Sequence, residues 1–248
     1  MKKVLAAFFF LGLAPAVSVA ACPDDAVLQR LTDMGNLYIG EMHGTQESPA
    51  FLACLVAYEI AHGVKPLTVS VEFENAARDM QSPVWRANDG RTSVAMAATL
   101  QWLMGEEAKG HVRLHFQRGD GVPFDRIERT YGEGIRAQAA AGRVIAYSGN
   151  IHARKTISAF SPALPAGTYV GPGFTHIDVE SVDKGTAWVN INGDTGVHAL
   201  VGSHPDEKPG TLVASKDDAY DFIYLVPAFT ASLPHLPGQL PPAGKVSP

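Results

Sequence analysis

A strand, a helix and a second strand follow one another early in the sequence, and this run constrains the fold more than any other feature. Leu37–Ile39 is apolar and strand-like, Ser48 followed by Pro49 predicts a helix start, and Gly63 predicts its end. Leu67–Val71 predicts the second strand. Parallel strands need a long connection of this kind, so we expect a right-handed crossover whose two strands are parallel neighbours.

The rest of the chain extends this alternation. Helices are expected over residues 93–109 and 124–141, and strands over residues 111–116 and 143–148. Beyond about residue 160, Gly/Pro-rich turns separate three short strand candidates, at 168–170, 187–191 and 222–226. The predicted fold is α/β: a three-layer α/β/α arrangement with a mixed, mainly parallel sheet and antiparallel additions from the C-terminal third.

The composition limits the number of domains and the class of partner. The 248 residues are 46% hydrophobic, which suits one well-buried core. Charged residues make up only 18%, and the net charge of -5 provides no basic field for nucleic acid. We expect a single α/β domain over residues 22–233, and a Pro-rich, disordered tail over residues 234–248.

The amino-terminal segment has the features of a secretory signal. Lys2 and Lys3 precede a short apolar run over residues 4–13, and small residues continue to Ala21. This pattern predicts a signal peptide over residues 1–21 and an exported protein, periplasmic or secreted. No later stretch approaches the length of a membrane span, so the mature chain is expected to have none.

The sequence contains two cysteines, Cys22 and Cys54. An even number in an exported protein favours a disulfide, which would connect the mature amino terminus to the first long helix. The alternative is a lipoprotein, because Val19-Ala-Ala-Cys22 resembles a permissive lipobox. Cys22 would then carry a membrane anchor, and Cys54 would be a buried free thiol.

Acidic and imidazole side chains follow several of the predicted strands. Glu41 and His43 follow the first strand, Glu72 ends the second, and His152 follows the fourth. The carboxyl ends of parallel strands lie at one edge of a sheet, where α/β proteins place their ligands. We therefore expect these four side chains to form one site. The substrate contacts are expected from flanking polar residues, namely Glu47, Glu74, Gln117, Asn150 and Arg154.

Two imidazoles and two carboxylates are compatible with two kinds of chemistry. One histidine could act as base for water while the other groups polarise the substrate, without a metal. The same side chains, His43, His152, Glu41 and Glu72, could instead bind a divalent metal. The sequence lacks the Gly-x-Ser-x-Gly elbow of serine hydrolases and the glycine-rich fingerprints of phosphate and dinucleotide binding.

The motifs around these residues resemble the erythromycin esterase/ChaN-like and Tiki/TraB superfamily. Members share two Gly-x-x-His motifs and a glutamate on an α/β core. Here these are Gly40-Glu-Met-His43, Gly149-Asn-Ile-His152 and Glu72. The resemblance covers roughly residues 35–155 and extends to the residues that follow each motif, Gly-Thr-Gln-Glu and Ala-Arg-Lys.

The resemblance implies an exported hydrolase of an ester or amide, acting on a small molecule or a peptide. His43 would be the general base, Glu41 and Glu72 its orienting or polarising partners, and His152 an electrophilic or protonating group. Tiki-like members are metal-dependent proteases, whereas ChaN-like members bind haem without catalysis, which is the alternative function. The chain is shorter than the erythromycin esterases with this pattern and has no room for their helical lid, which argues against a macrolide substrate.

Overall fold

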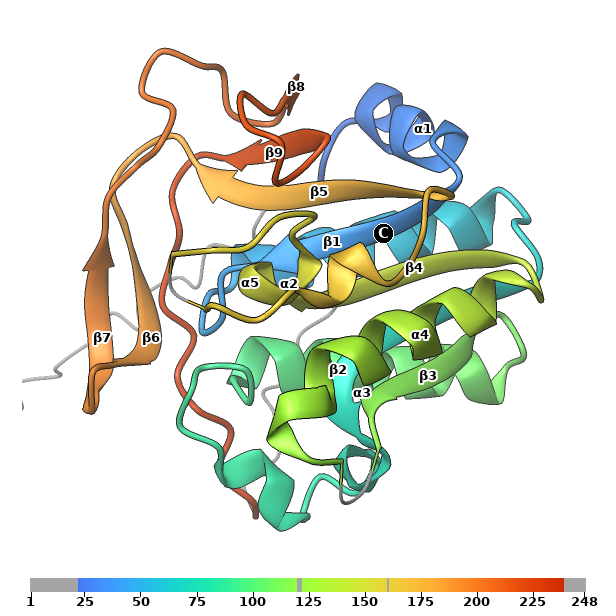
Figure 1. Ribbon diagram of the computed structural model, residues 1–248, viewed down its shortest axis with the longest axis horizontal. Helices are drawn as coiled ribbons and strands as arrows, with labels where there is room; N and C mark the ends of the chain where they lie inside the picture. The colour runs from blue at the N-terminus through green and yellow to red at the C-terminus, as the bar shows by residue number, and fades with distance from the viewer. Residues whose placement is uncertain (1–21, 120–121, 160, 239–248) are drawn as a thin grey trace, which may run out of the picture.

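A seven-stranded sheet forms the middle layer of the protein (Figure 1). The computed structural model describes residues 22–119, 122–159 and 161–238. The strand order is β3-β2-β4-β1-β5-β9-β8, and every neighbouring pair is parallel except β8 and β9. The strands are β1 (Asn36–Glu41), β2 (Leu67–Glu74), β3 (Arg113–Arg118), β4 (Arg143–Gly149), β5 (Phe174–Ser181), β8 (Leu212–Ala214) and β9 (Phe222–Val226).

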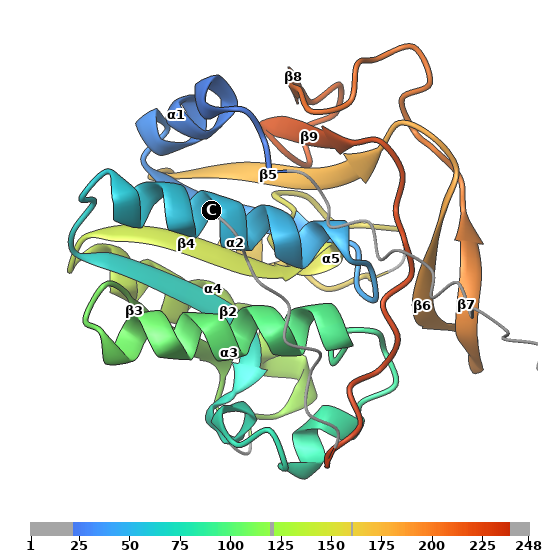
Figure 2. The same ribbon diagram turned by 180° about the vertical axis from the view of Figure 1, so that it is seen from behind.

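Helices cover both faces of this sheet, as Figures 1 and 2 show from opposite sides. Helices α2 (Glu47–Ala61) and α3 (Val94–Ala108) pack on one face, and α1 (Asp25–Asp33) lies against α2. Helices α4 (Ile127–Ala139) and α5 (Asn150–Ala153) pack on the other. The fold is therefore the three-layer α/β/α arrangement that the sequence predicted.

The central strands are apolar on both faces because both faces are covered. In β1, Leu37 and Ile39 lie in the core under α2 and α3, whereas Tyr38 lies in the core under α4. All three side chains have no exposed surface. Successive strand residues point to opposite faces, so a strand in this position needs a continuous apolar run rather than an alternating one.

The predicted adjacency of β1 and β2 is wrong, because β4 lies between them. Leu37 of β1 pairs with Ile145, and Val69 of β2 pairs with the same residue from the other side. The connection through α2 therefore leaves room for one strand between β1 and β2. Strand β4 fills this interior position and is buried from Val144 to Gly149. The carboxyl ends of the three strands still lie side by side.

The start of α2 also differs from the prediction. The helix begins at Glu47, and Gln46 occupies the cap position without a side-chain hydrogen bond to the backbone. The Ser48 hydroxyl accepts a hydrogen bond from the Thr45 hydroxyl at 3.1 Å instead of capping the helix. Glu47 is the acidic residue of the first turn, where a carboxylate complements the helix dipole.

The C-terminal third adds parallel as well as antiparallel strands. The sequence reading missed β5, which pairs with β1 in parallel, and placed a strand at residues 168–170, where the chain instead forms a 3₁₀ turn over Ala166–Thr168. A side chain at Gly167 would meet the Arg154 carbonyl oxygen at 2.2 Å, so the chain packs there as a tight turn. Strands β6 (Gly185–Ile191) and β7 (Asp194–Leu200) form a separate hairpin beyond the carboxyl ends of the sheet (Figures 1 and 2).

Two glycines support this hairpin. The Trp188 amide donates to the Gly44 carbonyl oxygen at 3.0 Å. A Cβ atom at Gly44 would lie 1.9 Å from the Trp188 carbonyl oxygen, and one at Gly90 would lie 2.5 Å from it. Both glycines also have positive φ angles, +67° and +91°. Only glycine allows this close approach, which fixes the hairpin on the turn that follows His43.

The segment after β9 crosses the carboxyl edge from α2 to α3. Thr230 accepts a hydrogen bond from the Gln46 amide at 2.9 Å, and Leu233 accepts one from the Val94 amide at 2.8 Å. His235 is buried edge-on against Trp85, with 5.3 Å between the ring centroids. Residues 234–238 of the predicted tail thus belong to the described fold, and residues 239–248 lie outside it.

A disulfide joins Cys22 to Cys54 of α2. It uses the sulfur atom that a lipid anchor at Cys22 would need, so the structure argues against the lipoprotein alternative. The predicted signal peptide, residues 1–21, lies outside the described residues. Within the described part, no helix has the length and apolar character needed to span a membrane. Both findings are compatible with an exported protein.

Removal of the disulfide is expected to destabilise the fold. The bond closes a loop with a sequence separation of 32 residues, for which the chain-entropy relation gives about 3–4 kcal/mol. The double variant Cys22→Ser/Cys54→Ser should lower the free energy of unfolding in urea by about this amount. Reductant should destabilise the wild type and leave the double variant unchanged. Equal stability of the two proteins under oxidising conditions would contradict the prediction.

Candidate functional site

The buried carboxylate of Glu72 lies at the centre of the site. It comes from the end of β2 and is 6% exposed. The Gly149 amide donates to its Oε2 atom at 2.7 Å, and Arg91 Nη1 donates to its Oε1 atom at 3.2 Å. Burial raises the pKa of Glu72, but the charges of His152, Arg91 and His43 outweigh it and lower the pKa to about 2. Glu72 is therefore a carboxylate at all physiological pH values.

His43 approaches Glu72 from the end of β1. Its Nδ1 lies 2.8 Å from Glu41 Oε1, and its Nε2 lies 3.8 Å from Glu72 Oε2. The Tyr147 hydroxyl donates to the other Glu41 oxygen. Burial lowers the pKa of His43, but Glu41 and then Glu72 raise it to about 9. The free protein therefore holds His43 as an imidazolium ion at neutral pH.

His152 approaches Glu72 from the short helix after β4. Its Nδ1 lies 2.7 Å from Glu128 Oε1, and its Nε2 lies 3.5 Å from Glu72 Oε1. The Ala166 amide donates to the second oxygen of Glu128 at 2.8 Å. Burial lowers the pKa of His152, whereas the charges of Glu72 and Glu128 raise it above its ordinary value.

The two histidines thus have matching environments. Each donates an Nδ1 hydrogen to its own carboxylate, which fixes the tautomer and the ring orientation. Each directs Nε2 toward the shared carboxylate of Glu72. The side chains of His43 and His152 are 20% and 23% exposed, so water or a substrate group can reach both rings while Glu72 stays covered.

The glycines of both Gly-x-x-His motifs are required by space. A Cβ atom at Gly149 would lie 2.8 Å from His43 Nε2. One at Gly40 would lie 2.9 Å from Asp178 Oδ1 and 3.0 Å from the Asn150 Cα atom. Glycine at Gly149 lets the His43 ring approach the second motif, and glycine at Gly40 lets Asn150 of the second motif approach the first.

The fold brings together the four site residues that were predicted from the strand ends, although β1 and β2 are not adjacent. These residues are Glu41, His43, Glu72 and His152. The flanking residues have other partners. Gln117 is buried and donates to the carbonyl oxygens of Ser70 and Tyr147 at 3.1 and 3.2 Å. Glu74 forms an ion pair with Arg118 at 3.2 Å on the next strand.

The remaining three flanking residues form no hydrogen bond or ion pair with Glu72 in the described part of the chain, although Asn150 follows Gly149, whose amide binds that carboxylate. The Asn150 carbonyl oxygen accepts a hydrogen bond from the Tyr220 hydroxyl, and Arg154 lies over the same ring at 5.7 Å from its centroid. Glu47 accepts a hydrogen bond from the Thr230 amide at 2.8 Å and lines a different pocket.

Sequence reasoning missed three residues of the site: Arg91, Glu128 and Tyr147. Arg91 belongs to the long segment between β2 and α3, and only that segment's length indicated a functional cover. Glu128 is the acidic residue in the first turn of α4, where helix-dipole stabilisation would explain it equally well. Tyr147 looked like one more apolar residue of a buried strand.

The side chains present do not fit a divalent metal. In the described part of the chain, no group of three or more His, Cys, Asp or Glu side chains is arranged to hold one. The Arg91 guanidinium is bonded to Oε1 of Glu72 at 3.2 Å, and the Gly149 amide is bonded to its Oε2 at 2.7 Å. A second cation in this place would lie beside the Arg91 guanidinium.

Comparisons with known proteins support the fold class. No protein-family model matches the sequence, and no curated protein matches it. A solved structure called a succinoglycan biosynthesis protein aligns over 83% of this chain and 92% of its own, with a TM-score of 0.55 and 8% identity. A structure of a Bacillus cereus protein aligns over 84% and 93%, with a TM-score of 0.53 and 12% identity. At these identities the likeness shows a shared α/β fold.

The charged cluster is expected to make stability depend on pH. The pKa of Glu72 is about 2 in the folded protein against an ordinary 4.5, so its contribution is present above pH 4.5 and is lost as pH falls toward 2. The pKa of His43 is about 9 against an ordinary 6.5, so its contribution is present below pH 6.5 and is lost as pH rises through 9.

The variant Glu41→Gln isolates the alkaline part of this dependence. Between pH 6.5 and 9, the wild type should lose on the order of 2–3 kcal/mol of unfolding free energy through His43. The variant should lose much less, because Glu41 is the largest charge that raises this pKa. Urea unfolding of both proteins across that range measures the difference. Parallel curves would show that His43 does not titrate as described.

Proposed function

We propose that the protein is an exported hydrolase that cleaves an ester or amide bond at the cluster of Glu41, His43, Glu72 and His152. The observation that carries the proposal is the paired arrangement of the histidines. Each ring is oriented through Nδ1 by its own carboxylate, and both Nε2 atoms face Glu72. An oriented imidazole beside a fixed charge is the arrangement that general acid–base catalysis requires.

His43 is the proposed base. In its neutral form, Nε2 takes a proton from water as the water oxygen attacks the acyl carbon. Glu41 accepts the Nδ1 hydrogen and stabilises the imidazolium ion that forms. The Tyr147 hydroxyl holds the second oxygen of Glu41 in place. Glu72, which stays ionised, adds further stabilisation to the charged ring.

His152 is the proposed acid. The charges of Glu72 and Glu128 raise the pKa of His152, which favours the protonated ring that an acid needs. That proton passes to the leaving oxygen or nitrogen as the acyl bond breaks, so water contributes a hydroxyl to one product and His152 a proton to the other. The charges of His152 and Arg91 oppose the negative charge that develops on the acyl oxygen. Glu128 keeps the His152 ring in position through Nδ1.

Haem binding without catalysis, the ChaN-like alternative, makes a different demand on the same residues. It needs an imidazole nitrogen free to bind iron, whereas each Nε2 here lies within 4 Å of a carboxylate that also binds Arg91. This crowding favours hydrolysis over haem binding. A Soret band on adding haem to the wild type, lost in His43→Ala, would reverse that preference.

Loss of His43 is expected to abolish turnover. The variant His43→Ala should reduce the rate of hydrolysis of p-nitrophenyl butyrate or a p-nitroanilide by about 10²–10⁴, the usual contribution of a general base. His62→Ala is the matched control, because His62 lies exposed at the end of α2 and hydrogen-bonds the Tyr58 carbonyl oxygen. Activity equal in both variants would exclude the proposed role.

Metal analysis of the active protein tests the metal-free mechanism.

The pH dependence of turnover is expected to report the pKa of His43. Only neutral His43 acts as base, so kcat/KM should rise with pH through a limb near 9. In Glu41→Gln this limb should move to lower pH, because the principal charge that raises the pKa is removed while the amide oxygen still accepts the Nδ1 hydrogen. A limb at the same pH in both proteins would assign the base to another group.

A further inference from the structure

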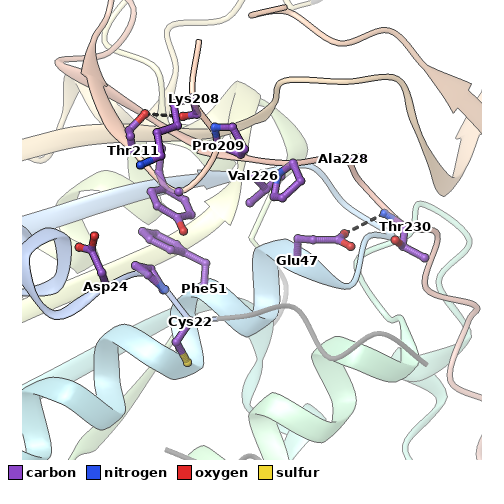
Figure 3. Close-up of a pocket in the computed structure, with 14 residues that line it drawn as sticks. Cys22, Asp24, Glu47, Phe51, Lys208, Pro209, Thr211, Val226, Ala228 and Thr230 are labelled. Carbon is purple, nitrogen blue, oxygen red and sulfur yellow. Dashed lines mark hydrogen bonds between the residues drawn. The ribbon is translucent and has the colours of Figure 1, made fainter. Parts of the chain in front are cut away.

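A cavity separate from the Glu72 cluster lies at the carboxyl edge of the sheet, beside the first turn of α2 (Figure 3). Its volume is about 620 Å³, within the range of small-molecule sites. Its walls come from residues 22–24, α2, the loop before β8, and the end of β9 with the segment that follows. None of Glu41, His43, Glu72 or His152 lines it, so what binds here is separate from the proposed hydrolysis.

An aromatic pair forms the apolar side of this cavity. Phe51 and Tyr224 are stacked, with 4.4 Å between the ring centroids and an interplanar angle of 18°. Val226 and the prolines Pro209 and Pro227 extend the apolar lining. Such a surface offers an apolar ligand a place to pack out of water.

Tyr224 also brings an unused polar group. The residue is 4% exposed and lines the cavity, and no described residue forms a hydrogen bond with its hydroxyl. Burial and the nearby Asp24 raise the pKa of Tyr224 to about 12, so the hydroxyl keeps its proton. The open side of this hydroxyl is the cavity, where a ligand or water can supply a partner.

Glu47 is the second polar group with spare capacity. It is 8% exposed and lines the cavity. One of its oxygens accepts the Thr230 amide at 2.8 Å, as Figure 3 shows. Its other oxygen has no hydrogen-bond partner among the described residues. The contact with Thr230 and the helix dipole explain why an acidic residue stands here, but they leave this second oxygen free to accept a donor.

We propose that this cavity is a binding site for a small organic cation, an ammonium group carried on an apolar or aromatic body. The ammonium group donates to the free oxygen of Glu47, while the apolar body packs against the Phe51–Tyr224 pair. Asp24 adds a second negative charge to the lining, and Lys208, at an exposed position, is the opposing cation. Asp24 is also exposed and caps α1 through the Val27 amide, so the buried Glu47 is the charge that favours a positively charged ligand over an anion.

The test uses the oxidised protein labelled with ¹⁵N and phenethylammonium as the probe. Titration should shift the backbone amide signals of Gly210, Thr211 and Thr230, with saturation below about 10 mM. The neutral analogue 2-phenylethanol should bind at least about tenfold more weakly, because it lacks the charge that a buried carboxylate pairs with. No saturable shift with phenethylammonium, or equal binding of the two probes, overturns the proposal.

Three variants identify the groups responsible. Glu47→Gln keeps an acceptor for the Thr230 amide but loses the charge, and should weaken phenethylammonium binding about tenfold. Tyr224→Ala removes one ring of the stacked pair and should weaken it about tenfold. Lys208→Ala should leave binding unchanged or tighter. Unchanged binding in Glu47→Gln, with wild-type amide signals elsewhere in the sheet to show that it folds, overturns the proposal.

Discussion

The burial of one carboxylate, that of Glu72, is the constraint on which the rest of the site depends. A carboxylate removed from water is stable only if cations and hydrogen-bond donors replace the water it has lost. Arg91, the Gly149 amide and the two histidines supply these groups, and they come from three segments of the chain, because Gly149 and His152 belong to one motif. The charge of Glu72 therefore gathers those segments, and the histidines in turn need carboxylates of their own. The result is a continuous chain of ion pairs from Glu41 through His43, Glu72 and His152 to Glu128.

The sheet order makes this cluster possible. β4 lies between β1 and β2, so its end faces the ends of both strands, and the chain turns there into the helix that carries His152. If β1 and β2 were adjacent, the Gly149 amide could not lie between His43 and Glu72. The absence of a side chain at Gly149 is equally necessary, because a methyl group there would fill the space that the His43 ring occupies. The cluster therefore depends both on the strand order and on the absence of a side chain at Gly149.

The composition of the site was predictable in part from the sequence. Glu41, His43, Glu72 and His152 could be identified because each follows an apolar run that ends at the same edge of a parallel sheet. Arg91 and Glu128 could not, because they lie on a loop and on a helix, and nothing in their local sequence indicates which carboxylate or imidazole they face. The strand order was missed for a similar reason: local patterning determines strands but not which strand enters between two others. β5 was missed because its apolar residues are interrupted by polar ones that the fold buries, such as His176 and Asp178.

The two glycines beneath the β6–β7 hairpin have a consequence for movement. The Trp188 backbone lies directly on Gly44 and Gly90, and it hydrogen-bonds the first of them. Gly44 follows His43 in the chain, so the hairpin cannot lift or slide without displacing the turn that positions that imidazole. The hairpin and the turn that carries His43 are therefore expected to move as one unit, because a shift of either would break the Trp188 contact with Gly44.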